Sequence, residues 1–137
     1  MKPRVAILVL SSLLLFLFTY TGISKLADPE GFRAVLLRMP LIARGAAALA
    51  VAVPSAELVI ALLLLFPRTR LKGLYGSLVL LSVFTCFLLY MVLFVPRLPC
   101  SCGGVIGSLS WKEHVVLNTG LMGLTVLGIR RVRKENR

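Results

Sequence analysis

Residues 5–24, VAILVLSSLLLFLFTYTGIS, form a run of twenty residues without a charge. At about 1.5 Å per residue, an α-helix of this length spans about 30 Å, the thickness of a bilayer's hydrocarbon core. The alternative is a cleaved signal peptide, but the run is longer than a signal core and no small-x-small cleavage site follows it before Lys25. We therefore expect a membrane helix.

Three further apolar runs follow. Residues 45–66 carry one acid, Glu57, and one proline, Pro54, whereas residues 74–95 carry no charge. The last run, 115–129, is short, but Trp111 and Lys112 can anchor it at the interface and extend it back by one turn. The predicted fold class is all-α, an integral membrane four-helix bundle in one domain, 1–137, with spans near 5–24, 45–66, 74–95 and 111–129.

The composition agrees with a membrane protein. Of 137 residues, 58% are hydrophobic, far above the usual share in a soluble domain. The formal charge of +11 would permit nucleic-acid binding. However, the cations lie at the edges of the apolar runs, and no basic face is interleaved with aromatic residues. We expect membrane lipid, and no nucleic acid, as a partner.

The distribution of cations predicts the orientation. Ten lie at the two termini and between the second and third runs, whereas six are spread over the other two, longer loops. The positive-inside rule then places both termini in the cytoplasm of a bacterial inner membrane, with the loops after the first and third spans facing outward. The ten are Lys2, Arg4, Arg68, Arg70, Lys72, Arg130, Arg131, Arg133, Lys134 and Arg137; the six are Lys25, Arg33, Arg38, Arg44, Arg97 and Lys112.

The polar stretch 25–44 predicts a short amphipathic helix on the membrane surface, between the first two spans. Asp-Pro-Glu at residues 28–30 is a helix-start signal, and Pro40 ends the helix. The apolar positions are Phe32, Val35, Leu36 and Met39.

Two of the three cysteines, Cys100 and Cys102, occur in the third loop within Pro-Cys-Ser-Cys-Gly-Gly. In an oxidising compartment this pair can form a small, strained and therefore labile disulfide, which suits thiol-disulfide exchange. The alternatives are inert thiols, a static bridge that staples the loop, or a zinc site. Zinc is the weakest, because two thiolates and one histidine leave a closed site without a fourth ligand. We expect no metal.

Three other polar or sulfur residues are candidates for structural or functional roles. Cys86, mid-helix, is too far along its helix to pair with the loop cysteines and is expected to be a small packing residue. His114 follows Cys102 by twelve residues and either holds or deprotonates a thiol or binds interfacial water. Glu57 is either a polar clamp between helices or part of a proton path or quinone contact. Its expected partner is Asn118, which shares a helix face with His114, or alternatively Thr85.

These pieces together resemble the DoxX-like membrane protein superfamily and, within it, the MauE branch. The resemblance implies a four-helix redox-associated membrane protein that helps to form or maintain disulfides in exported proteins, with the CxC pair as its redox element. Gly103-Gly104 stands here where the branch commonly has Phe-Gly after the second cysteine. The matching pieces are Gly22-Ile23-Ser24-Lys25-Leu26, Asp28-Pro29, Phe32, Pro54, Glu57, Cys100-Ser101-Cys102-Gly103, Trp111, His114 and Asn118.

The functional hypothesis is a membrane thiol-disulfide redox protein in which Cys100, Cys102 and His114 are catalytic. Its expected partner is an exported or thioredoxin-like protein. A membrane quinone is a candidate cofactor, by analogy with four-helix quinone-linked oxidases, although no motif identifies a quinone site. The main alternative is a non-enzymatic scaffold beside a larger partner; a solute transporter built around Glu57 has thinner support. The scaffold is suggested by Gly73, Gly76, Gly120 and Gly123, because small residues let helices approach closely.

Overall fold

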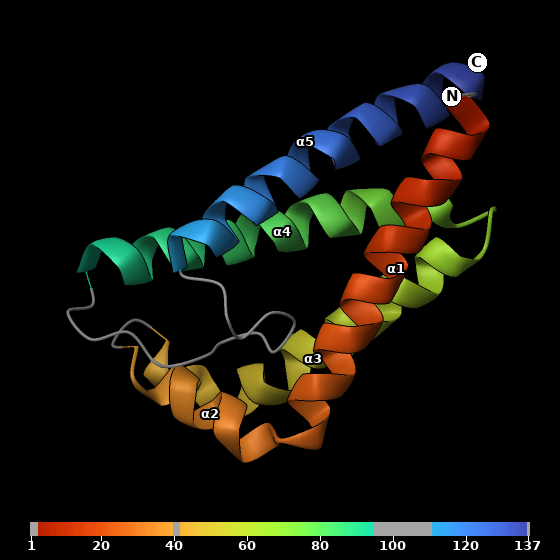
Figure 1. Ribbon diagram of the computed structural model, residues 1–137. Coiled ribbons are helices and arrows are strands. Elements are labelled where there is room, and N and C mark those ends of the chain that lie inside the picture. The colour runs from red at the N-terminus through yellow and green to blue at the C-terminus, as the bar shows by residue number, and fades with distance from the viewer. Residues whose placement is uncertain (1–2, 40–41, 95–110, 137) are drawn as a thin grey trace.

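The computed structural model describes residues 3–39, 42–94 and 111–136, and in this part of the chain every regular element is a helix. The prediction of an all-α fold is therefore confirmed. In order along the chain the elements are α1 (Pro3–Ala27), α2 (Pro29–Leu37), the short 3-10 helix η1 (Ala43–Gly45), α3 (Ala46–Leu65), α4 (Arg70–Phe94) and α5 (Trp111–Glu135), as shown in Figure 1.

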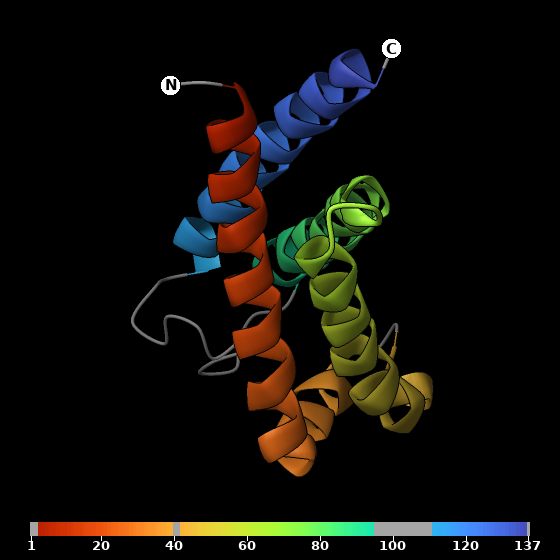
Figure 2. The ribbon, with the colours of Figure 1, turned by 90° about the vertical axis from the view of Figure 1, so that its right-hand side faces the viewer.

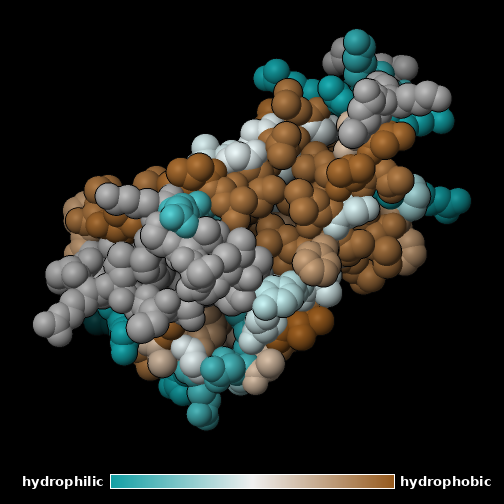
Figure 3. Space-filling model, in the orientation of Figure 1, coloured by the Kyte–Doolittle hydropathy of each residue, from teal (hydrophilic) through white to brown (hydrophobic). Residues whose placement is uncertain are grey.

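Four of these helices, α1, α3, α4 and α5, are long and apolar enough to cross a membrane. The predicted helical membrane bundle is confirmed, whereas the division into a single domain stays a prediction. Large apolar side chains cover much of the face seen in Figure 3, and charged side chains gather toward the ends. A soluble monomer rarely exposes a continuous apolar surface of this extent, but a lipid-facing surface requires it.

The first membrane helix is longer than its uncharged run. Helix α1 continues to Ala27, so Lys25 lies in its last turn and not in a loop as expected. The chain turns only at Asp28, whose carboxylate accepts a hydrogen bond from the backbone N–H of Gly31 at 3.1 Å and caps the next helix. Because a cap with Pro29 at the first helical position is a strong start signal, the break falls there.

Helix α2 is the predicted short amphipathic helix between the first two spans. Leu36 is buried and packs with Ala46 and Ala50 of α3, and Phe32 lies against the same cluster. The other face of α2 carries the exposed Arg33. The helix therefore lies against the beginning of α3, at the end of the bundle opposite the two chain termini (Figures 1 and 2).

Helices α1 and α3 run antiparallel and are packed together, as are α4 and α5, while α3 and α4 join the two pairs (Figure 2). The turn between α3 and α4 is tight. A Cβ at Gly73 would lie 2.9 Å from the backbone nitrogen of Leu64, so only glycine permits this approach. The buried core contains Leu14, Phe18, Ile60, Ala61, Leu64, Leu74, Leu81, Leu121 and Ile129.

Candidate functional site

A buried ion pair joins the first and third helices. Lys25 Nζ donates a hydrogen bond to Glu57 Oε1 at 2.9 Å, and the side chains are 8% and 0% exposed. Charged groups this deep in a membrane bundle are costly unless they are paired, and they usually mark a specific role. The pair is therefore the central feature of the candidate site.

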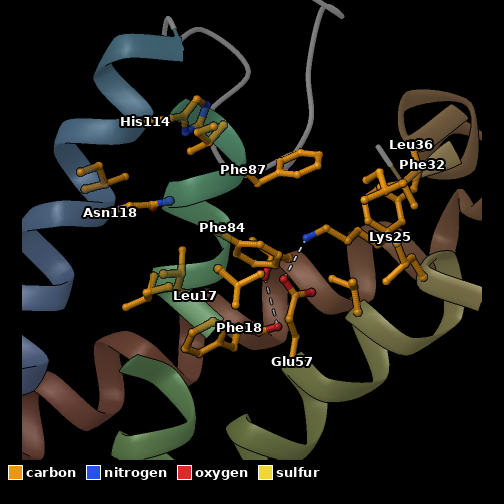
Figure 4. Close-up of a pocket in the computed structure, with 18 residues that line it drawn as sticks. Leu17, Phe18, Lys25, Phe32, Leu36, Glu57, Phe84, Phe87, His114 and Asn118 are labelled. Atoms are coloured by element: carbon orange, nitrogen blue, oxygen red, sulfur yellow. Dashed lines mark hydrogen bonds and ion pairs between the residues drawn. The ribbon is translucent and has the colours of Figure 1, made fainter. Parts of the chain in front are cut away.

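A close approach of α1 to α3 makes this pair possible. A Cβ at Gly22 would lie 3.1 Å from the Leu58 side chain and 3.3 Å from the Pro54 carbonyl oxygen, so glycine lets the helices meet there. Helical side chains lean toward the N-terminus of their own helix. Because α1 and α3 are antiparallel, Lys25 and Glu57 lean toward each other across this contact (Figure 4).

Two aromatic rings complete the surroundings of the ammonium group. Lys25 Nζ lies 5.5 Å from the ring centroid of Phe32 on α2 and 5.4 Å from that of Phe84 on α4. Both distances suit a cation–π interaction, which gains strength away from water. Four helices thus converge on one ammonium group.

The ion pair forms part of the wall of a cavity of about 270 Å³. Apolar side chains from α1 to α5 make up most of the lining, and Figure 4 shows Phe84 and Phe87 of α4 beside the pair. Apolar cavities with a few convergent polar groups are typical ligand sites. The polar or charged lining residues are Thr21, Lys25, Glu57, His114 and Asn118.

Only one of the two carboxylate oxygens of Glu57 accepts a hydrogen bond from the described residues. Its Oε1 accepts the bond from Lys25, but Oε2 is buried and accepts no hydrogen bond from the described residues. Thr21 lies against the same carboxylate, but its hydroxyl donates to the Phe18 carbonyl at 3.4 Å. A buried acceptor without a donor is unfavourable, so a hydrogen-bond donor placed beside Oε2 would stabilise it.

His114 and Asn118 lie one turn apart in the first part of α5, and both line the cavity together with Glu57 (Figure 4). The expected hydrogen bond between Glu57 and Asn118 is wrong: Lys25 donates to Oε1 of Glu57, and Oε2 accepts no hydrogen bond from the described residues. Thr85, the alternative partner, donates to the Leu81 carbonyl at 2.7 Å and contacts the Met122 sulfur. Lys25 and Glu57 pair because their side chains lean toward each other across the contact of α1 with α3.

The cysteines fall into two groups. Cys100 and Cys102 lie within 95–110, outside the described residues. Cys86 is exposed on α4, so its expected role as a packing residue is wrong. The reason is its helix register, since the neighbouring Thr85 and Leu88 occupy the inward face of α4.

Lys25 is the site residue that sequence reasoning missed. A lone acid in a span demands a partner, and the nearest cation beyond the first uncharged run was a candidate. Its position directly after that run placed it instead in the loop, as a cation at the membrane edge. Only the continuation of α1 to Ala27 turns it into the bundle.

Comparison with known proteins identifies a family. A family model described as "Methylamine utilisation protein MauE" matches residues 3–131. The resemblance to MauE is therefore confirmed, whereas the wider DoxX-like placement stays a prediction. No curated protein and no solved structure matches the chain.

Proposed function

The chain belongs to the MauE family, and on this premise we propose that it exchanges thiols and disulfides with exported proteins of methylamine utilisation. A multi-pass membrane protein of this family suits such a role, because a loop on the outer side of the membrane reaches the compartment where disulfides persist. The observation that carries the proposal is the Cys100-Ser-Cys102 sequence in the connection from α4 to α5.

The connection begins after Phe94 and ends at Trp111, and both cysteines lie outside the described residues. His114, in the first turn of α5, follows Cys102 by twelve residues and lines the buried cavity. We assign His114 the task of accepting a proton from one thiol, since a nearby imidazole favours the thiolate.

In the proposed cycle, a thiolate of the exported protein attacks Cys100 of the Cys100–Cys102 disulfide. The S–S bond breaks, Cys102 leaves as a thiolate, and a mixed disulfide forms. A second thiolate of the exported protein then displaces Cys100, so that the exported protein gains a disulfide and both loop cysteines become thiols. Reoxidation removes two electrons and two protons. The proposed acceptor is a membrane quinone, which becomes a quinol, or the disulfide of a thioredoxin-like protein, which becomes a dithiol.

The proposed orientation places both termini in the cytoplasm and the cysteine loop outside. Figures 1 and 2 draw the two ends of the chain at the same end of the bundle. Cations of α5 and of the turn from α3 to α4 are candidates for the cytoplasmic edge. The ion pair would then lie toward the outward-facing half, on the same side as the cysteine loop.

The experiment uses thiol counting in a Cys86→Ser background, so that only the loop pair reacts. Membranes are equilibrated at a series of glutathione redox poises, quenched with acid and labelled with a mass-tagged maleimide. We expect two tags on the reduced pair and none on the oxidised pair. The average number of tags should fall from two to zero across the series of redox poises, with a measurable midpoint. Cys100→Ser and Cys102→Ser each take up one tag at most. A tag number that is the same at every poise would contradict the proposal.

A second candidate function is a non-enzymatic scaffold. Of the four glycines that suggested it in the sequence, two favour it in the structure. Gly73 and Gly76 pack inside the bundle against Leu64 and Ile60, whereas Gly120 and Gly123 are exposed on α5 with open space around them. An exposed small pair lets another membrane helix approach closely. A stoichiometric partner that is lost with Gly123→Leu and survives loss of both loop cysteines would favour the scaffold.

A further inference from the structure

The thiol exchange proposed above uses His114 from the wall of the cavity, but it gives the cavity itself, beside Lys25 and Glu57, no ligand. We propose that it binds an uncharged, lipid-soluble molecule that carries a hydroxyl group at one end. The polar groups of the wall determine the head of this ligand, and the apolar groups determine its body. This site does not depend on the proposed thiol-disulfide function.

The two charged side chains present a donor and an acceptor side by side. Glu57 Oε2 is buried and accepts no hydrogen bond from the described residues. The Lys25 ammonium carries three N–H donors, and one of them is directed to Glu57 Oε1. A hydroxyl group both donates and accepts, so it can donate to Oε2 while accepting from Nζ. An ether or a ketone cannot satisfy the carboxylate oxygen.

Charge selects against an ionic ligand. Lys25 and Glu57 form a pair with no net charge, and the other lining groups are apolar except for Thr21, His114 and Asn118. A carboxylate or ammonium ligand would lose its hydration without a free counter-charge in the wall, which is strongly unfavourable. A neutral hydroxyl loses far less.

The walls and the size determine the rest of the molecule. Phe32, Phe84 and Phe87 line the cavity, and its volume is about 270 Å³. Pockets for drug-sized ligands occupy about 300–1,000 Å³, so the space accepts a ring or a short segment of a chain. Because the cavity lies among helices that can cross a membrane, its ligand can enter from the lipid.

Two other occupants make different predictions. A single water would satisfy Oε2, since buried polar groups often hold one. A lipid acyl chain would fill the apolar part without needing a hydroxyl. Each of them leaves a hydroxyl-bearing probe without a preference for the site.

The test uses the full chain in lipid nanodiscs with a photoreactive probe, a decyl chain bearing a diazirine and a terminal hydroxyl group. Its methyl ether is the matched control probe. Loss of a hydrogen bond to a charged group changes affinity by about tenfold or more. We therefore expect the alcohol to label peptides of α3 and α4 about tenfold more than the ether does at equal concentration.

Matched variants locate the label. Val53 lines the cavity, whereas Val51 on the same helix is exposed. Val53→Phe should abolish the preference for the alcohol, and Val51→Phe should leave it unchanged. If Val53→Phe fails to fold in a thermal unfolding assay, Leu49→Phe fills the cavity from one turn away.

Equal labelling by alcohol and ether in the unaltered chain would overturn the proposal without any variant. So would labelling that Val53→Phe, correctly folded, does not reduce. The Cys100→Ser/Cys102→Ser chain should bind the alcohol as the unaltered chain does. Binding that survives in this chain supports the cavity site even if the thiol-disulfide function fails. Loss of binding would overturn the proposal that the cavity binds its ligand independently of the loop cysteines.

Discussion

The ammonium group of Lys25 lies 2.9 Å from Glu57 Oε1, and this contact ties the last turn of α1 to the middle of α3. The two residues are 32 positions apart in the chain. The rings of Phe32 and Phe84 flank the same ammonium group, so α2 and α4 also contact the ion pair. Both the stability of the bundle and the chemistry of the cavity depend on this arrangement.

Breaking the pair should destabilise the bundle more than removing it altogether. Lys25→Met or Glu57→Gln alone leaves a partner buried without its counterpart, which costs about 3–5 kcal/mol when the charge remains. Lys25→Met combined with Glu57→Gln should cost less than either change alone. Chemical unfolding in detergent micelles measures this, with the exposed Lys72→Met as a control expected to change stability by less than about 0.5 kcal/mol. Strictly additive losses would contradict the coupling.

The aromatic ring of Phe84 should stabilise the pair through its interaction with Lys25. Phe84→Leu is expected to lower the free energy of unfolding by about 1–2 kcal/mol more than Phe87→Leu does, because the Phe84 ring lies 5.4 Å from the ammonium group of Lys25. In a Lys25→Met background this difference should vanish. A double-mutant cycle measures the coupling, and an unchanged difference in that background would show that packing alone is involved.

Gly22 should tolerate no side chain, because it sets the distance between α1 and α3. Gly22→Ala brings a Cβ to 3.1 Å from the Leu58 side chain and 3.3 Å from the Pro54 carbonyl oxygen, so these neighbours must shift by a few tenths of an ångström. We expect the free energy of unfolding to fall by about 1–3 kcal/mol in an unfolding assay. Gly120→Ala is the matched control, since nothing lies within 4 Å of its Cβ, and it should be neutral or stabilising. Equal effects of the two changes would contradict the close approach.

The start of α2 should depend on the side chain of Asp28. Asp28→Ala removes the bond to the Gly31 N–H and should cost about 1 kcal/mol, whereas Asp28→Ser retains most of the cap. Hydrogen exchange by mass spectrometry should show faster exchange in peptides that cover α2 in the alanine variant only. Unchanged protection there would show that packing of Leu36 holds α2 without the cap.

The proposed orientation predicts which helix ends are accessible from outside the cell. In a chain with Cys86, Cys100 and Cys102 changed to serine, Arg33→Cys on α2 and Asn136→Cys after α5 supply single thiols at exposed positions. A membrane-impermeant maleimide on intact cells should label the first and not the second. Labelling of the second alone would place the cysteine loop on the cytoplasmic side.

Local patterns in the sequence predicted most of the fold. Residues 74–95 could be assigned to a span because hydropathy along one segment decides whether it partitions into lipid, and α4 covers nearly the same residues. An amphipathic helix between Asp28 and Pro40 followed from its start signal and from the spacing of its apolar residues, and α2 ends somewhat earlier, at Leu37. The predicted end of α1, at residue 24, is too early, since α1 continues to Ala27. An uncharged run shows which residues can contact lipid, whereas a helix extends for as long as its backbone hydrogen bonds continue.

The site was predictable only in part. The sequence by itself determined that Glu57 stands alone as an acid within a span, and that His114 and Asn118 share one helix face, since both depend only on position along a helix. The tertiary structure decided that Lys25 is the partner and that Phe32 and Phe84 flank it. Such a pairing depends on where two antiparallel helices cross and on the direction in which their side chains lean, and neither quantity is written in the hydropathy of a single segment.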